Sequence, residues 1–345
     1  MSNQSSKFPS DAEVVIVGVG GIVGSMLAYW LAELGQKNIV GLEKSTIIPS
    51  DIASTAHASD FVYNTTHDKL GCWATSFSRK FYEDNGFFLK KGGLEICRKD
   101  DDARWEELKR KVESGKAFGT NVRLISAAEA KEKFPLLDEE SIRGAMWDPD
   151  AGLVTPRSQD VVNFAVETAK EKGALKTFTD TPAIGFEIEN GRITGVKTDK
   201  GIIKTKKVVI ASGIWGPLMG DMAGVSVPLM PVEHPLLFFG PLPEIQGTDE
   251  LLVYPLLRDQ GNSAYVRDTG RLHGGMLEWG YYEDKEPRLV DPEDIGNPEK
   301  TMISDSMRYL DLEEVAEPLE KAFETTPILN ELGWDEKSSF NGLLS

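Results

Sequence analysis

Residues 13–44 constrain the fold of this chain more than any other stretch. They begin with an unbroken run of β-branched residues at 14–17, which is typical of a parallel strand buried on both faces. Apolar residues then recur at helical spacing up to Gly35, where a left-handed helix cap is expected, and a second apolar run follows at 39–42. This order of strand, helix and strand predicts the βαβ unit that opens a dinucleotide-binding domain.

The turn between the first strand and the helix is rich in glycine, with Gly18, Gly20, Gly21 and Gly24. Glycine lets backbone N–H groups approach a pyrophosphate closely, and the helix N-terminus adds a favourable partial positive charge. The second strand ends in Glu43, at the position where an acid binds a ribose hydroxyl. The stretch therefore predicts binding of a dinucleotide through an adenosine ribose that carries no 2′-phosphate.

This glycine turn departs from the strict fingerprint, which has glycine at its first, third and sixth positions. Counting from Gly18 the sixth residue is Val23, and counting back from Gly24 the first is Val19. The turn is therefore one residue longer than the fingerprint. The extra residue changes the geometry offered to a pyrophosphate unless a bulge absorbs it. A buried βαβ unit without a ligand is the alternative.

Composition argues against several classes of protein. The 345 residues, 40% hydrophobic and 27% charged, are an ordinary globular mixture with room for two cores. A net charge of −17 argues against binding to nucleic acid or to an anionic membrane surface. With no membrane-length apolar run and no signal peptide, we expect a cytoplasmic protein. Cys72 and Cys97 show no metal-binding or disulfide spacing.

A polar segment without helical or strand period follows Glu43 and is too long for a routine turn. Its centre is the sequence S-T-A-H-A at 54–58, and a second histidine follows at His67. From the residues alone, His57 and His67 are more often loop histidines bonded to neighbouring hydroxyls than functional groups.

Further helices and strands are predicted in the rest of the chain. Helices are predicted at 104–114, 126–134 and 158–172, the first as a charged surface helix that ends at Gly115. The Asn190-Gly191 pair predicts a β-hairpin, and a buried strand at 208–211 runs into small residues at the ligand-binding edge of the first sheet. After position 225, proline-rich strands predict a mostly antiparallel sheet.

Several short motifs are, in combination, similar to those of one family. They are S-T-A-H-A at 54–58, K-G-G-L-E-I at 91–96, F-P-L-L-D at 134–138, D-A-G-L-V at 150–154, A-S-G-I-W-G at 211–216, P-V-E-H at 231–234, A-Y-V-R at 264–267 and F-N-G-L-L-S at 340–345. With the N-terminal unit they resemble FAD-dependent amine oxidoreductases of the glycine oxidase and D-amino-acid oxidase superfamily. The resemblance is strongest to the branch of dimethylglycine oxidase, dimethylglycine dehydrogenase and sarcosine dehydrogenase.

The resemblance implies an α/β fold, in which a Rossmann-type FAD-binding domain is interleaved with a mostly antiparallel α+β substrate domain. Residues 11–85 and 150–222 would form the FAD-binding domain, and residues 86–149 and 223–335 the substrate domain. Residues 336–345 would begin the return to the FAD-binding domain. Family members continue from here into a strand and helix that close over the flavin, so we expect a fragment.

The resemblance also implies the roles of individual residues. His57 would be joined covalently to the 8α-methyl group of FAD, and His234 and Tyr265 would lie at the substrate, whereas the residues alone indicate core positions for both. No metal site is expected. The expected cofactor-binding residues are Gly18, Gly20, Gly21, Gly24, Glu43, Lys44, Ser54, Thr55, His57, Gly92, Gly93, Ala211, Gly213 and Trp215.

The implied reaction is the oxidation of an N-methylated amino acid, such as dimethylglycine or sarcosine. Hydride transfer to FAD would give an imine that hydrolyses to the demethylated amine and formaldehyde. Oxygen and an electron-transfer flavoprotein are both possible electron acceptors. Two alternatives stay open, a non-catalytic flavin-fold regulatory protein and a nicotinamide-dependent dehydrogenase. The latter would need neither the S-T-A-H-A stretch nor residues 91–96.

Overall fold

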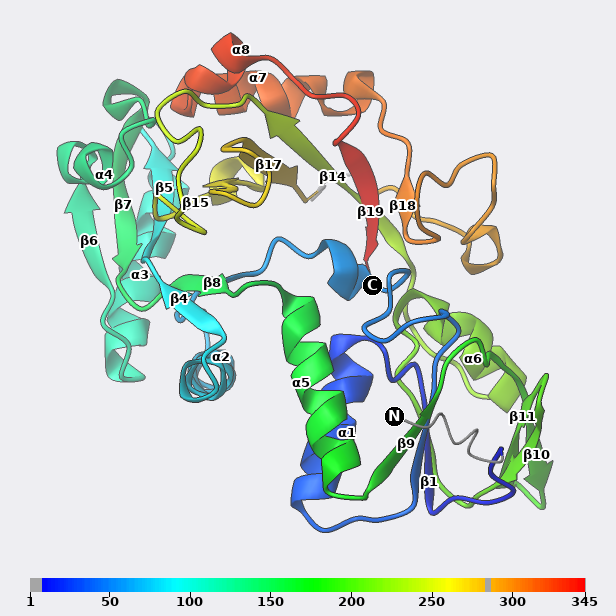
Figure 1. Cartoon of the computed structure of the whole chain (residues 1–345). Helices are drawn as coiled ribbons and strands as arrows, with labels where there is room; N and C mark the ends of the chain where they lie inside the picture. The colour runs from blue at the N-terminus through cyan, green and yellow to red at the C-terminus, as the bar shows by residue number, and fades with distance from the viewer. Residues whose placement is uncertain (1–7, 283–286, 345) are drawn as a thin grey trace.

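The computed structural model describes residues 8–282 and 287–344. Figure 1 shows two parts, one around a small parallel sheet near the N-terminus and one around a large sheet to which the last strand belongs. Stretches from both halves of the sequence contribute to each part. The mixed α/β architecture confirms the predicted fold class, and the division into domains stays a prediction.

The parallel sheet has four strands in the order β13-β1-β2-β9. Helices α1 and α5 cover one face, and the antiparallel sheet β10-β11-β12 covers the other (Figure 1). Because both faces are covered, all residues of β1 and β2 are buried, as their unbroken apolar runs predict. The bounds are β1 Val14–Val17, α1 Ile22–Glu33, β2 Ile39–Leu42, α5 Ser158–Glu171, β9 Leu175–Phe178, β10 Ala183–Glu189, β11 Arg192–Thr198, β12 Gly201–Lys204 and β13 Val208–Ile210.

The large sheet has nine strands in the order β18-β19-β14-β17-β16-β15-β5-β7-β6. Its neighbours pair antiparallel except β15 and β5, which confirms the predicted, mostly antiparallel sheet. The bounds are β5 Gly93–Arg98, β6 Arg123–Ser126, β7 Ile142–Asp148, β14 Val232–Phe239, β15 Leu256–Asp259, β16 Ala264–Asp268, β17 Leu277–Tyr281, β18 Met307–Arg308 and β19 Phe340–Leu344.

Helices cover one face of the large sheet. α4 (Ala127–Lys133), α7 (Ala316–Thr325) and α8 (Ile328–Leu332) pack against inward residues such as Ala264 and Val266 of β16. Tyr265 lies between these two residues and therefore points to the opposite face, where it packs with Leu236 and Phe340. This opposite face faces the candidate site.

A third sheet and a long segment link the two parts (Figure 1). The sheet is β3-β8-β4, with β3 Phe61–Val62, β4 Phe88–Lys90 and β8 Gly152–Val154, and α2 Lys69–Asp84 follows β3. The short helix η1 (Ser54–His57) reaches the end of β19, where the Ser54 hydroxyl donates to the Leu343 carbonyl at 2.7 Å. The S-T-A-H-A stretch and the last strand are therefore in contact.

The helix predicted at 104–114 differs from the prediction in two ways. α3 is Asp102–Ala117, so Gly115 lies inside the helix and does not end it. A side chain there would collide with Thr120 and Thr65, because α3 passes close to the loops that carry them. Nor are all of its charges solvated, since buried Lys111 pairs with buried Glu95 at 2.7 Å.

Two predicted features of the first part are confirmed. Asn190 and Gly191 both have positive φ, 51° and 72°, which is the geometry that a tight hairpin turn requires. Gly35 adopts a φ of 88° just after α1, as expected of a helix cap.

None of the helices that the structure describes is long and apolar enough to cross a membrane. Within the same residues no cluster of metal-ligating side chains occurs.

Candidate active site

The glycine turn begins directly after the last paired residue of β1, and the register of β1 and β2 is regular up to that point. The N–H groups of Gly18 and Val19 both donate to the carbonyl of Leu42, at 2.9 and 3.1 Å. The first two residues of the turn are therefore held by the end of β2. Beyond them, Gly24 packs directly on the turn, since a Cβ there would lie 2.1 Å from the Gly18 carbonyl oxygen. Only glycine allows α1 to begin so close to β1.

Glu43 connects the end of β2 to this turn. Its Oε2 accepts from the Gly20 N–H at 2.9 Å, and its Oε1 accepts from the Ser45 N–H and the Ser50 hydroxyl at 2.9 and 3.1 Å. The carboxylate is 5% exposed, and this burial raises its pKa while the hydrogen bonds oppose the rise. A carboxylate oxygen can accept two hydrogen bonds, so Oε2 keeps capacity for a ribose hydroxyl.

The residues after β13 gather at the same sheet edge. Ala211 donates to the Val17 carbonyl at 2.8 Å, and the next hydroxyl, that of Ser212, is buried without a hydrogen-bond partner among the described residues. Gly213 has a φ of 52° and opens the short helix η3 (Gly213–Trp215), which leads into α6 (Gly216–Ala223). The ammonium of Lys44 lies 4.8 Å from the centre of the Trp215 ring.

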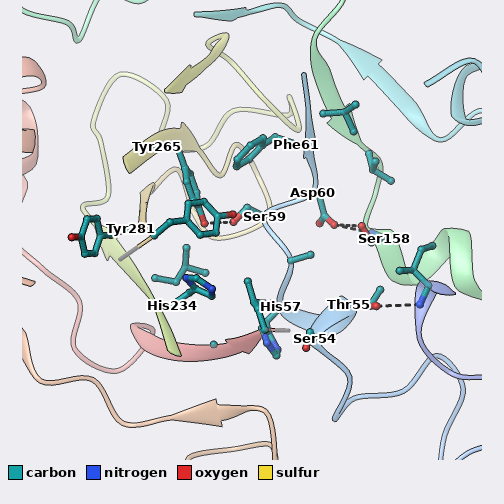
Figure 2. A pocket seen from close by; sticks show the side chains of 18 of the residues that line it. Ser54, Thr55, His57, Ser59, Asp60, Phe61, Ser158, His234, Tyr265 and Tyr281 are labelled. Atoms are coloured by element: carbon teal, nitrogen blue, oxygen red, sulfur yellow. Dashed lines mark hydrogen bonds between the residues drawn. The ribbon is translucent and has the colours of Figure 1, made fainter. Parts of the chain in front are cut away.

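A cavity of about 500 Å³ lies between η1, α5 and the open face of the large sheet (Figure 2). Five of the predicted site residues line this cavity, although they come from segments about two hundred residues apart. They are Ser54, Thr55, His57, His234 and Tyr265.

Gly92 and Gly93 lie outside the cavity. A Cβ on Gly92 would collide with the ring of Trp147, and one on Gly93 would collide with the ring of Tyr63. The glycine pair therefore lets two large aromatic side chains pack against the backbone that enters β5. A role of this pair toward a cofactor stays a prediction.

His57 is the least satisfied polar group of the cavity. Both of its ring nitrogens are buried and have no hydrogen-bond partner among the residues described. The pKa of His57 is lowered to about 4, chiefly by burial and to a smaller extent by the charge of Arg157, while the backbone of Leu343 opposes this lowering. The imidazole is therefore neutral at pH 7 and keeps a nitrogen lone pair available for bonding.

Two charged side chains that the sequence did not single out hold the His57 segment. Asp60, in a left-handed conformation with φ 61°, is buried and pairs with Arg157 at 2.7 Å. Arg157 also donates to the carbonyls of Ala56 and Ala58, at 3.3 and 3.1 Å. A candidate signal was the position of Asp60, two residues after S-T-A-H-A. Its partner, which precedes α5, could be found only in three dimensions.

His234 enters the cavity from β14. Its ring lies 4.9 Å from that of Tyr282, and its Nδ1 is buried without a hydrogen-bond partner within the described residues. Burial lowers the pKa of His234, so that the neutral form predominates at pH 7. A neutral imidazole with a free nitrogen is suited to accept a proton.

Tyr265 faces the cavity from β16 (Figure 2). Its hydroxyl forms a 2.6 Å hydrogen bond with the hydroxyl of Ser59, and its ring packs on Phe61 with centres 4.8 Å apart. Burial raises the pKa of Tyr265 well above the usual range, so that the phenol stays protonated. Opposite it in β17 stands Gly280, where a Cβ would lie 2.0 Å from the tyrosine ring. Ser59 is a further residue that sequence reasoning missed.

Sequence comparison places the chain among flavoenzymes. The profile "FAD dependent oxidoreductase" (DAO) matches residues 13–343. Human mitochondrial sarcosine dehydrogenase is 30% identical over 81% of this chain and 30% of its own length. Rat mitochondrial dimethylglycine dehydrogenase is 27% identical over 92% of this chain and 36% of its length. The mouse mitochondrial pyruvate dehydrogenase phosphatase regulatory subunit is 28% identical over 82% of this chain and 31% of its length.

The chain spans about a third of the length of the curated relatives it matches. Among solved structures, that of L-proline dehydrogenase from P. horikoshii has a TM-score of 0.79 and 28% sequence identity, and the match covers 97% of this chain and 82% of that one. These comparisons do not test the expected cytoplasmic location, which stays a prediction.

The family profile covers nearly the whole sequence, including the glycine turn and the segments that line the cavity. This chain therefore belongs to the family of FAD-dependent oxidoreductases.

Proposed function

We propose that this site oxidises an N-methylated amino acid, such as dimethylglycine or sarcosine, to an imine that hydrolyses to the demethylated amine and formaldehyde. Bound FAD supplies the acceptor for the hydride lost from the carbon next to nitrogen. The observation that carries the proposal is the meeting of His57, His234 and Tyr265 at one cavity. The names of the sarcosine and dimethylglycine dehydrogenases support the choice of substrate.

The sheet edge suits FAD. α1 begins at Ile22, and its first turn carries no acidic residue. The Ile22 N–H donates to the Thr55 hydroxyl at 3.1 Å, and the partial positive charge of this helix end favours a diphosphate beside it. Ser212 offers a buried hydroxyl without a partner among the described residues, and Glu43 offers an acceptor for a ribose hydroxyl. These residues would hold the dinucleotide.

His57 is the residue through which FAD would be attached covalently. Its neutral, unpartnered nitrogens on the cavity wall support this assignment. The attachment is tested by acid precipitation of the purified protein. A yellow pellet is expected from wild type, and a colourless pellet with a yellow supernatant is expected from His57→Ala. Colour that stays with the His57→Ala pellet would exclude this residue.

His234 and Tyr265 would prepare the amine. An amine must be unprotonated to release a hydride from its neighbouring carbon, and His234 is a neutral base that can take up the ammonium proton. Tyr265, protonated and held by Ser59, would orient the amine through a hydrogen bond. Apolar walls such as Phe61 and Leu236 would limit the access of water.

Anaerobic reduction tests the function. Dimethylglycine or sarcosine should bleach the flavin absorbance within the time of a turnover, and formaldehyde should appear in proportion to the flavin reduced. The rates of reoxidation by air and by an electron-transfer flavoprotein then identify the acceptor. A yellow protein that no N-methylated amino acid bleaches would contradict the proposal.

The second candidate is a non-catalytic regulatory role, which the likeness to the phosphatase regulatory subunit favours. It predicts a protein that binds FAD but is not reduced by amines. The nicotinamide-dependent alternative has no support from the comparisons, because the family is FAD-dependent.

A further inference from the structure

The ring of His57 depends on its backbone for its orientation. Both ring nitrogens are buried without a hydrogen-bond partner among the described residues. The ring packs against β19, with its centre 5.7 Å from that of Phe340, and a Cβ on Gly342 would lie 3.1 Å from His57 Cδ2. These packing contacts limit where the ring can lie. How the side chain enters the cavity follows from how the chain on both sides of it is held.

Arg157, the residue before α5, holds the chain on both sides of His57. One nitrogen of its guanidinium, Nη2, donates to the carbonyls of Ala56 and Ala58, at 3.3 and 3.1 Å. A second nitrogen of the same group, Nε, lies 2.7 Å from Asp60 Oδ2. Because the guanidinium is planar and rigid, these three contacts are fixed relative to one another. Arg157 thus connects both neighbours of His57 to one carboxylate.

Asp60 anchors this arginine. Its side chain is 2% exposed, and its Oδ1 accepts from the Ser158 N–H at 3.0 Å and from the Ser158 hydroxyl (Figure 2). Its backbone carbonyl accepts from the Val154 N–H at 2.7 Å. The φ of Asp60 is 61°, which residues other than glycine adopt only rarely. Its contacts with α5 and β8 stabilise this conformation.

The same contacts relate His57 to the edge of the parallel sheet. α5, which begins at Ser158, packs on that sheet through Val166 and Ala169, which share a core with β1. The Thr55 hydroxyl also accepts from the Ile22 N–H at the start of α1. Two helices that cover the parallel sheet therefore hold the segment that carries His57. Its position is thereby fixed relative to the glycine turn.

We propose that Arg157 and Asp60 are positioning residues, which orient the His57 ring for its covalent attachment to FAD. This inference rests on the attachment proposed above. In that attachment a ring nitrogen of His57 forms a bond to the 8α carbon, while one imidazole proton and one 8α proton are released. The two electrons of the broken C–H bond pass to the flavin, and oxygen removes them when the reaction is run in air.

NMR of the histidine rings in the flavin-free protein tests the positioning without the cofactor. The chain has four histidines, so carbon-13 labelling of their rings allows each to be followed, and His57→Gln identifies the signal of His57. We expect a single sharp His57 signal from wild type. In Arg157→Met this signal should split or broaden at least about twofold, because a ring on a loosened backbone samples several rotamers. The signals of the other three histidines should not change.

The rate of covalent incorporation measures the consequence. Saturating FAD is added to the flavin-free protein in air, and samples are precipitated with acid at intervals. Arg157→Met should slow the appearance of flavin in the pellet about 10- to 100-fold, the cost of a small misplacement of a reacting group. Arg157→Lys should also be slow, because an ammonium keeps the charge beside Asp60 but lacks the planar set of donors. Asp60→Gly, which permits the left-handed conformation without a carboxylate, should give a smaller loss.

Arg98 provides the matched control. Its Nε lies 3.2 Å from the carboxylate of a buried aspartate, Asp259, and it also donates to a backbone carbonyl, that of Lys321. It does not line the cavity. Arg98→Met should therefore lower the melting temperature, as Arg157→Met does, but leave the His57 signal and the rate of flavin incorporation unchanged.

The outcomes separate this proposal from the attachment itself. An unchanged His57 signal in Arg157→Met, incorporation as fast as in wild type, or equal effects of Arg98→Met would overturn the positioning role. If Arg157→Met fails to fold, Arg157→Lys decides by the same two measurements. A colourless pellet from wild type removes the proposed attachment, and the His57 signal then decides alone whether Arg157 positions the ring.

Discussion

The glycine turn and the cavity are built in opposite ways. In the turn, residues 18–24 pack directly on one another, and the Glu43 carboxylate is hydrogen-bonded to the Gly20 N–H and to Ser45 and Ser50. In the cavity, nitrogens of His57 and His234 are buried without partners among the described residues. The carboxylate of the turn is hydrogen-bonded within the protein, whereas the cavity contains buried nitrogens without partners among the described residues.

The difference shows where stability and chemistry are located. Packing at Gly18, Gly20 and Gly24 leaves no room for a Cβ, so substitutions at these positions should act on folding. Unsatisfied groups in the cavity contribute little to folding, because leaving a buried polar group without a partner costs free energy. Substitutions in the cavity should therefore act on ligands and rates. The following predictions test this division in order of expected size.

The largest effect is expected from removal of the base in the cavity. His234→Ala should slow anaerobic flavin reduction by roughly 10² to 10⁴, the usual contribution of a general base. Because burial lowers the pKa of His234, the wild-type rate should fall only when the pH drops below the ordinary histidine range. Stopped-flow reduction across pH measures both. A near wild-type rate with a lowered melting temperature would mean that His234 is only a packing residue.

A substitution in the glycine turn should act on folding. Gly24→Ala places a Cβ 2.1 Å from the Gly18 carbonyl oxygen and should lower the free energy of unfolding by about 1–3 kcal/mol or more. Gly21→Ala is the matched control, because its Cβ would make only ordinary contacts at 3.7 and 3.8 Å. Urea unfolding of both variants measures the difference. Equal stability of the two would contradict the tight packing of the turn.

The buried imidazole of His57 should make stability depend on pH. In the folded, flavin-free protein its pKa is about 4, below the usual value of 6.5 in the unfolded chain. Its contribution is therefore complete above pH 6.5 and is lost as the pH falls toward 4, with roughly 2 kcal/mol lost between pH 7 and pH 5. Urea unfolding of wild type and His57→Gln isolates this contribution, since the other groups titrate in both. Parallel pH curves would contradict it.

The smallest effect is expected at the Tyr265 hydroxyl. Tyr265→Phe removes the hydrogen bond to Ser59 and keeps the ring, so flavin reduction should slow by about tenfold, the equivalent of one hydrogen bond. Ser59→Ala should give a smaller loss in the same direction, because the phenol remains but is no longer held. A Ser59→Ala variant slower than Tyr265→Phe would show that Ser59 has a role of its own.

Local sequence determined the first part of the molecule. The strands at 14–17 and 39–42, the helix between them and the cap at Gly35 lie close together in the chain, so short-range periodicity and glycine positions were enough to predict them. The same holds for the hairpin at Asn190-Gly191. Gly115 lies inside α3, where a Cβ would collide with Thr65. That close packing could not be predicted, because Thr65 is distant in sequence.

The cavity was decided by tertiary structure. The resemblance singled out His57, His234 and Tyr265, but neither spacing nor composition indicated that Ser59 would hold Tyr265, that Arg157 would hold Asp60, or that Arg258 would lie unpaired among the described residues. These residues come from the segment after η1, from the position before α5 and from strands β15 and β16, and a residue pattern records periodicity along one element only. Which side chains meet across elements depends on how the sheets pack and in which register the strands pair.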